Sequence, residues 1–337
     1  MRYLIAIAIF LVAGVLGTTY LGFTMLQSGL EPVDAGQGQT VFFEVVPGST
    51  TWDVAHQLDA QDLIKNPTLF IVLGRLLDLE GDLQAGWYQI SSSASPLEIM
   101  RQLARGEMAH RTFTIPEGLT AVQTKERLVA AGLGDPTTFS ELFEDPARVS
   151  DWLPADFESE KSPLEGYLHP DTYQVPMDAD EATILDVMIT NFADFWDPAR
   201  LDRARKRGLT VHQAVTLASI VERETVRPNE RPMVAGVFFN RLKAEMKLEA
   251  CATVRFALAK PEGALTEVDL LVDDLYNTYR HPGLPPGPIA SPGSASLEAV
   301  LHPASVPYYY FVARGDGSHA FAVTYQEHLA NIAKYLE

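Results

Sequence analysis

The stretch VHQAVTLASIVERET, residues 211–225, is apolar on nearly every face of a helix. Such a helix is buried rather than exposed, because it has no polar face to turn toward water. Its last turn carries Glu222 and Glu224, and each carboxylate continues an apolar stripe of the helix. Burial beside such a stripe raises the pKa of a carboxyl group toward that of a general acid. The sequence therefore predicts a buried helix that ends either in a catalytic glutamate or in two partly solvated glutamates paired with Arg223 and Arg227.

A helix and a loop that would border these carboxylates follow in the sequence. Pro228 ends the first helix, and residues 230–243 (ERPMVAGVFFNRLK) predict another, with Asn240 and Arg241 near its end as site groups or cap residues. Residues 276–293 (YNTYRHPGLPPGPIASPG) contain too many Pro and Gly residues for a helix or a central strand. They predict a long, rigid, aromatic loop that is well suited to line a groove.

The remaining C-terminal sequence predicts a mixed α+β domain. Residues 182–207 predict one or two amphipathic helices, and residues 296–302 predict a short one. Residues 308–313 and 320–324 predict the two strands of a β-hairpin around a Gly-Asp-Gly turn. Residues 136–160 are acidic and predict mostly loop.

The region before this domain predicts a smaller α+β structure. Residues 41–46 and 86–90 predict two short strands. Helices are predicted to begin at Thr50, at Asn66 and at Ser95, because each of these residues is a favoured N-cap before an apolar periodic stretch. The fold class of the whole chain is therefore predicted to be α+β.

Part of this pattern recurs farther along the chain. FEVVPGSTT at residues 43–51 is echoed by FTIPEGLTA at residues 113–121, and each copy predicts a strand, a turn and a capped helix. Two such units would be carbohydrate-binding modules or structural supports. Trp52, Trp87 and Tyr88 are the aromatic residues available for a sugar platform, although aromatic side chains also serve core packing.

Composition excludes several classes of function. The net charge of −18 over 337 residues argues against a nucleic-acid partner, which requires clustered Lys and Arg residues. Cys251 is the only cysteine, so the chain forms no intrachain disulfide and has no Cys-x-x-Cys motif. The sequence contains no HExxH, GxSxG, P-loop or dinucleotide-binding motif. We therefore predict no metal site and no cofactor.

The N-terminal residues predict a membrane anchor. Residues 3–30 contain no charged side chain, and residues 4–26 satisfy the requirement of about 20 apolar residues for a helix that crosses a bilayer. Arg2 precedes this stretch, whereas Glu31 and Asp34 follow it, which predicts a cytoplasmic N-terminus and an extracytoplasmic body. A cleaved signal peptide is the alternative, but its apolar region would be shorter.

Five motifs, in this order, resemble one known family. They are EGYLHPDTY (residues 165–173), ASIVERET (218–225), ERPMVAGVFFNRLK (230–243), the loop at 276–293, and YFVARGDGSHAF (310–321). Together with the N-terminal anchor they resemble the MltG/YceG-like endolytic murein transglycosylases. The resemblance implies a transmembrane anchor at residues 1–26, a linker at 27–40, a LysM-like subdomain at 41–107 and a mixed α+β catalytic domain at 108–337.

The resemblance also implies roles for particular residues. The family's catalytic glutamate falls on Glu224, which makes Glu222 a secondary, orienting or structural residue. Substrate-binding or supporting roles are implied for Asn240, Arg241, Thr253, Asn277 and Tyr279. The family commonly has Asp-Pro where this chain has Cys251-Ala252, so any contact made by that aspartate would be lost here.

The implied activity is non-hydrolytic cleavage of the glycosidic bond between N-acetylmuramic acid and N-acetylglucosamine in peptidoglycan strands. Glu224 would act as acid and then as base, and the product would carry a 1,6-anhydro end. The resemblance further implies action at the inner membrane on nascent strands, limiting their length, beside peptidoglycan synthases. Two other hypotheses are a hydrolase of the same bond and a non-catalytic peptidoglycan-binding scaffold of the cell-wall synthesis machinery.

Overall fold

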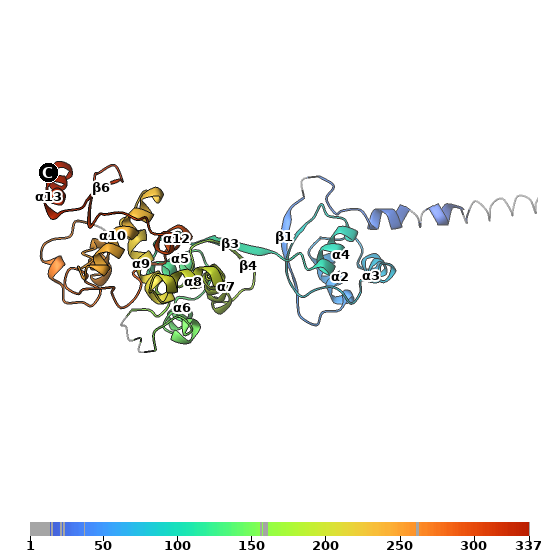
Figure 1. Ribbon diagram of the computed structural model, residues 1–337. Helices are drawn as coiled ribbons and strands as arrows, with labels where there is room; N and C mark the ends of the chain where they lie inside the picture. The colour runs from blue at the N-terminus through green and yellow to red at the C-terminus, as the bar shows by residue number, and fades with distance from the viewer. Residues whose placement is uncertain are drawn as a thin grey trace, which may run out of the picture. The chain divides into compact units, whose positions relative to one another are not determined.

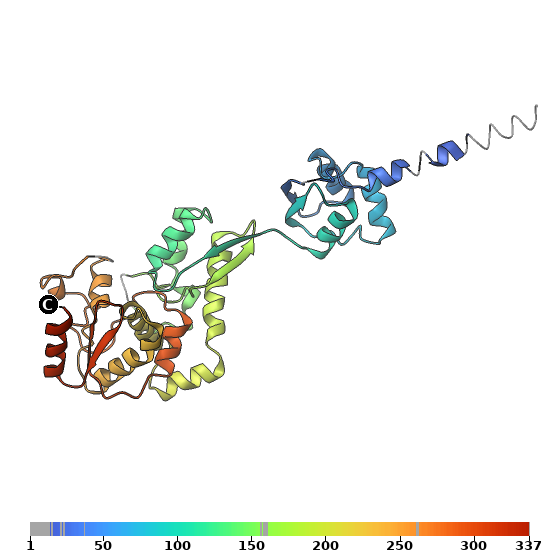
Figure 2. The same ribbon diagram turned by 90° about the horizontal axis from the view of Figure 1, so that it is seen from above.

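The computed structural model describes residues 14, 16–20, 22, 24–36, 38–155, 157, 161–260 and 263–336 (Figures 1 and 2). These residues form two compact units. The first runs to Arg111 and also contains Gln174–Ala179, and the second contains Thr112–Tyr173 and the chain from Asp180 onward. The chain passes from one unit to the other within two strands that pair with each other, β3 (His110–Thr114) and β4 (Thr172–Pro176).

The fold is mixed α+β, as predicted, and its sheets within the described residues are all two-stranded. Most of the predicted membrane span, residues 4–26, lies outside the described residues. In the part of the chain that is described, no helix combines the length and the apolar composition needed to cross a bilayer.

Between Thr40 and Arg105, the first unit contains a two-stranded antiparallel sheet and three helices, as predicted. Its elements are β1 (Thr40–Val45), α2 (Thr51–Ala60), α3 (Pro67–Leu76), β2 (Gly86–Ser91) and α4 (Pro96–Arg105). Phe43 of β1 lies opposite Tyr88 of β2, and both side chains are fully buried together with Leu58 of α2. Tyr88 is therefore a core residue rather than part of a sugar platform, whereas Trp52 is exposed and stacks on His56.

Local sequence signals start the helices of this unit. Thr50 and Ser95 each form a capping box with the acidic residue three positions later, Asp53 and Glu98 respectively. Asn66 caps α3 by accepting a hydrogen bond from a backbone N–H of the first turn. These three helix starts are confirmed because the capping side chains and the backbone donors belong to the same short segment.

The second unit is mostly helical and is built around α9 (Val211–Glu224). Its other elements, besides its parts of β3 and β4, are α5 (Ala121–Ala130), α6 (Pro136–Phe143), α7 (Glu181–Phe195), α8 (Pro198–Lys206), α10 (Arg231–Lys243), α11 (Cys251–Ala257), α12 (Ser294–Leu301), β5 (Tyr310–Ala313), β6 (His319–Ala322), α13 (Tyr325–Tyr335) and three 3₁₀ turns, Pro146–Val149, Pro228–Glu230 and Asp269–Leu271. Helices α8, α10, α11 and α12 all contact α9. Every residue from Ala214 to Val221 is buried, which confirms the predicted buried helix.

The second copy of the sequence repeat does not form a small unit of its own. Its helix α5 has the predicted cap at Thr120 but belongs to the larger unit. The buried carboxylate of Glu165 accepts a hydrogen bond from the backbone N–H of Ala121, the first residue of α5. The start of α5 is therefore held both by its own cap and by a side chain from 44 residues farther along the chain.

Three helices are absent from the sequence-based expectations. The prediction of mostly loop at residues 136–160 is wrong for α6, which Asp135 caps through two backbone N–H groups. Helix α13 starts with a capping box of Thr324 and Glu327. Helix α11 begins without a side-chain cap, so no local signal marks its start. The long loop at residues 276–293 contains no helix or strand, as predicted.

Replacement of Gly166 by alanine is expected to destabilise the second unit. Its φ is +86°, and a Cβ atom there would lie 2.5 Å from Cβ of Pro288 and 3.0 Å from a methyl carbon of Val215. Gly166→Ala should lower the free energy of unfolding by about 2–4 kcal/mol, from left-handed backbone strain and overpacking together. Gly208→Ala is the matched control in urea unfolding, because its φ is +75° but its Cβ would meet nothing within 4 Å. Equal losses in the two variants would contradict the packing explanation.

Candidate active site

Glu224 is the last residue of α9, and its side chain meets the start of α11. Its Oε1 accepts a hydrogen bond of 2.8 Å from the backbone N–H of Ala252. No ion pair to Glu224 occurs among the described residues, and the residue keeps partial access to solvent. Burial raises the pKa of Glu224, while the Ala252 N–H and the nearby charges of His319, Arg255 and Arg223 oppose that rise. A carboxyl group in this environment is suited to donate a proton.

Glu222 lies two residues before Glu224 in the last turn of α9, and both of its carboxylate oxygens make contacts with neighbouring helices. One carboxylate oxygen pairs with Arg231 of α10 at 2.8 Å. The other accepts hydrogen bonds from the backbone N–H of Gly293 and the hydroxyl of Ser296, which join it to the N-terminal end of α12. Both side chains of the ion pair are at least nine-tenths buried. Glu222 therefore ties three helices together and offers no free oxygen for chemistry.

The arginines expected to pair with these glutamates have other partners. Arg223 donates a hydrogen bond to the carbonyl oxygen of Gly118, and Arg227 pairs with Asp316 in the β5–β6 turn. The expectation of Arg223 and Arg227 as partners is wrong because the cation that reaches Glu222 comes from the next helix.

A buried His319–Glu230 pair lies near Glu224 and was missed by the analysis of the sequence. The imidazole Nδ1 of His319 is 2.7 Å from a carboxylate oxygen of Glu230, which also accepts the backbone N–H of His319. His319 acts electrostatically on Glu224, since it lowers the pKa of that carboxyl. The histidine in the motif YFVARGDGSHAF and the first glutamate of ERPMVAGVFFNRLK were the available signals for this pair.

Three of the predicted supporting residues, Thr253, Asn277 and Tyr279, lie at the start of α11 or in the loop at residues 276–293 that contacts it. Tyr279 has its hydroxyl 3.1 Å from the sulfur of Cys251, and burial, followed by the neighbouring Cys251 and Glu224, raises the pKa of this phenol. Asn277 is fully buried and accepts the backbone N–H of Tyr279. The hydroxyl of Thr253 donates to the carbonyl oxygen of Ala250. The structure thus brings Tyr279 near Glu224 and uses the other two to shape the backbone.

Asn240 and Arg241 make structural contacts with backbone carbonyl groups. The Asn240 amide donates to the carbonyl oxygens of Val306 and Tyr308. The buried Arg241 guanidinium donates to carbonyl oxygens at Tyr309, Lys247 and Leu248 and pairs with Glu249. These two residues therefore hold the segment that precedes β5 and the turn after α10.

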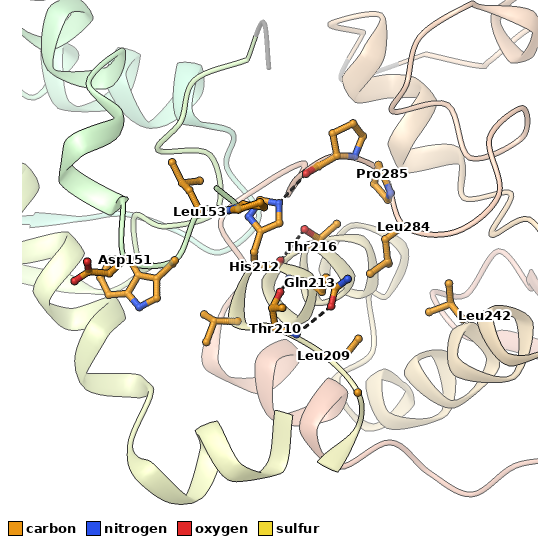
Figure 3. A pocket seen from close by; sticks show the side chains of 15 residues that line it. Asp151, Leu153, Leu209, Thr210, His212, Gln213, Thr216, Leu242, Leu284 and Pro285 are labelled. Atoms are coloured by element: carbon orange, nitrogen blue, oxygen red, sulfur yellow. Dashed lines mark hydrogen bonds between the residues drawn. The ribbon is translucent and has the colours of Figure 1, made fainter. Parts of the chain in front are cut away.

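Two cavities lie at opposite ends of α9. The larger, about 760 Å³, surrounds the N-terminal end and is lined by Thr210, His212 and Leu284 among others (Figure 3). There, His212 lies 2.7 Å from the carbonyl oxygen of Pro286, and burial lowers its pKa. A helix of 14 residues extends about 20 Å, so this cavity is remote from Glu224. The smaller cavity, about 420 Å³, includes Ala252, the residue that donates to Glu224.

Among the described residues, no group of three or more His, Cys, Asp or Glu side chains could hold a metal ion. A partly buried carboxyl of raised pKa can donate a proton, and a phenol and an imidazole near it can form hydrogen bonds to a polar substrate.

Comparison with known proteins agrees with the sequence motifs. The model of the YceG-like family matches residues 43–334. The chain belongs to the YceG-like family. Its relatives include an endolytic murein transglycosylase of Bacillus subtilis strain 168, which is 31% identical over 92% of this chain and 89% of that protein. Another relative, the endolytic murein transglycosylase of Streptococcus pneumoniae strain D39, is 28% identical over 94% of this chain but only 62% of its own length.

A solved YceG-like structure supports the same assignment. The 2.6 Å crystal structure of a yceG-like protein from Listeria monocytogenes aligns with a TM-score of 0.60 and 31% identity. The alignment covers 87% of this chain and 99% of that one. The YceG-like fold therefore extends over most of this chain.

Proposed function

We propose that this YceG-like protein is an endolytic lytic transglycosylase that cleaves the glycan strands of peptidoglycan. The observation that carries this proposal is Glu224 at the end of α9, a carboxyl that accepts the N–H of Ala252, has a pKa raised by burial and forms no ion pair in the described part of the chain. The endolytic murein transglycosylases of B. subtilis and S. pneumoniae, which match over nearly the whole of this chain, support the substrate class.

The mechanism follows from one carboxyl that serves twice. Protonated Glu224 donates its proton to the oxygen that links C1 of N-acetylmuramic acid to the next N-acetylglucosamine, and positive charge develops at C1 as this bond breaks. The 6-hydroxyl of the same muramic acid attacks C1, and ionised Glu224 accepts its proton. The products are a 1,6-anhydro end and a free 4-hydroxyl, so no second carboxylate is needed. Glu222 is already occupied by Arg231, which is consistent with this scheme.

The ionised state of Glu224 is supported by the N–H of Ala252. This bond strengthens when the carboxyl loses its proton, and the charge of His319 acts in the same direction. Ala252 stands where the family commonly has proline, which has no N–H. In this chain the backbone therefore supplies a hydrogen bond that a proline could not donate.

Analysis of the reaction products tests the proposed function. The purified protein is incubated with isolated glycan strands, and the new ends are identified by mass spectrometry. We expect 1,6-anhydro ends that lie within strands rather than only at their termini. Reducing ends would instead show a hydrolase that uses water, and unchanged strands would show a non-catalytic binding protein.

We propose in addition that residues 4–26 anchor the protein in the inner membrane, with residues 41–107 forming a LysM-like subdomain outside it. The uncharged composition of residues 3–30 and the charges on either side support the anchor. Action on nascent strands beside the synthases, which would limit strand length, is part of the same proposal.

The dependence of activity on pH is expected to reveal the raised pKa of Glu224. Because the acid must carry its proton, kcat/KM should fall as pH rises through a pKa above the ordinary glutamate value of 4.5. Ala252→Pro removes the N–H that favours the ionised form, so this falling limb should move to still higher pH. A wild-type limb below pH 4.5, or a limb that Ala252→Pro moves toward lower pH, would contradict the assignment.

A further inference from the structure

The 420 Å³ cavity next to Glu224 carries a cluster of cationic side chains. Lys161, Arg223 and Arg255 line it, and Phe256 forms an apolar part of its wall. Its volume is within the range of small-molecule sites, roughly 300–1,000 Å³. Among the described residues, the carboxylates that line the same cavity are Glu165 inside it and the exposed Glu126 and Glu144.

Arg255 is the residue that indicates an anionic ligand. Its buried Nη1 has no hydrogen-bond partner among the described residues, although a buried N–H that lacks a partner is costly. The planar guanidinium group is suited to a carboxylate, which accepts two of its N–H donors at once. Arg223 also lines the cavity, and its Nη1 donates a hydrogen bond to the carbonyl oxygen of Gly118.

The acidic residues of the cavity do not cancel this positive character. Glu165 accepts the N–H of Ala121, and its burial raises its pKa to about 8, so it is largely neutral at pH 7. Glu126 and Glu144 are exposed to solvent, where water and salt screen their charge. The interior of the cavity is thus an environment for an anion.

The chemistry of the substrate places an anion close to this cavity. The bond that Glu224 protonates is at C1 of muramic acid, and the lactyl group of the same sugar is at C3. The rigid ring keeps these two positions within one sugar width of each other. Ala252 is both a wall of the cavity and the donor to Glu224, so a sugar bound at Glu224 would lie beside the cavity that Arg255 lines.

We propose that this cavity is a subsite for the carboxylate-bearing C3 substituent of the muramic acid whose bond is cut. The proposal rests on the proposed function, because it uses the position of that bond. The carboxylate is either the lactyl carboxylate of a strand without peptide or a carboxylate of an attached peptide stem. Arg255 binds it directly, and Arg223 and Lys161 supply additional positive charge.

Binding of soluble tetrasaccharides tests the subsite separately from catalysis. The full chain carrying Glu224→Gln is titrated calorimetrically with GlcNAc–MurNAc tetrasaccharides in three forms. One form carries peptide stems, one has free lactyl carboxylates, and one has those carboxylates converted to neutral methylamides. Each titration is repeated with Arg255→Gln and with Arg255→Lys added. Arg205→Gln on α8 is the charge-matched control, because Arg205 is exposed and does not line this cavity.

Arg255→Gln is expected to weaken binding of a carboxylate form about tenfold, as for the loss of a charged hydrogen bond, and to leave binding of the methylamide form unchanged. Arg255→Lys should retain part of the affinity, and Arg205→Gln all of it. The form that loses affinity identifies the source of the carboxylate. Equal loss for all three forms, or loss for none, overturns the subsite.

Cleavage by the wild-type protein distinguishes failure of the subsite from failure of the proposed function. Cleavage without any effect of Arg255→Gln on binding leaves the activity and removes the subsite. Carboxylate-dependent binding through Arg255 without cleavage keeps a carboxylate-binding cavity, but it removes the activity and with it the assignment of the cavity to a muramic acid whose bond is cut. Absence of both binding and cleavage overturns both proposals.

Discussion

Glu224→Gln is expected to reduce cleavage of glycan strands by about 10³-fold or more, since general acid and base catalysis each contribute on the order of 10²–10⁴. The amide oxygen of Gln can still accept the N–H of Ala252, so the geometry at the start of α11 should be retained. The measurement is the rate at which new ends form on isolated strands. A variant that digests strands at an undiminished rate would remove Glu224 from the mechanism.

Two controls separate chemistry from folding in this experiment. Glu267→Gln makes the same change at an exposed position and should leave the rate unaltered. Stability against pH gives a second check, because burial raises the pKa of Glu224 above 4.5. The protonated form of Glu224 therefore contributes stability to the folded state below pH 4.5, and this contribution is lost as pH rises through the raised pKa. The free energy of unfolding of Glu224→Gln should therefore increase relative to that of the wild type as pH rises through that range.

Arg231→Met is expected to lower the free energy of unfolding by about 3–5 kcal/mol, because it leaves the buried carboxylate of Glu222 without its cation. Arg231 also pairs with Glu117, so the segment before α5 loses a contact as well. Urea unfolding of the purified protein measures the change. A loss below about 1 kcal/mol would show that the pair behaves like an exposed one.

The matched control for Arg231→Met is Lys206→Met, which breaks an exposed ion pair with Asp202. Exposed pairs contribute roughly 0–1 kcal/mol, so this variant should be nearly neutral. A further variant, Glu222→Met combined with Arg231→Met, should recover much of the lost stability, because it removes both buried charges together. No recovery would assign the loss to packing rather than to the unpaired charge.

The elements that the sequence predicted well are those with local signals. Thr50, Ser95 and Thr120 start helices through capping bonds within their own first turn, and the alternating strands β1 and β2 bury Phe43 and Tyr88. Helix α11 was missed because its N-cap residue, Ala250, has no side chain that can accept a capping hydrogen bond. Its position depends instead on contacts such as the hydrogen bond from Ala250 to Thr278, which no short sequence pattern reports.

The candidate site was only partly predictable for the same reason. The sequence placed Glu222 and Glu224 at the end of a buried helix, but its apolar stripes did not distinguish them; only the family resemblance favoured Glu224. The His319–Glu230 pair was not predicted, because its two residues are 89 positions apart. The cluster around Arg255 was also not predicted, because its members come from segments that are far apart in the chain.

By itself, the sequence determined the helix that carries both glutamates, its burial and the family to which the motifs point, since apolar periodicity and capping act over a few residues. The tertiary structure alone decided which carboxyl is left without a cation. Arg231 from α10 and the N-terminal end of α12 neutralise Glu222, while Glu224 accepts a backbone N–H from α11 and forms no ion pair within the described part of the chain. The physical reason is that burial and nearby charge set a carboxyl's pKa, and both come from segments distant in the chain.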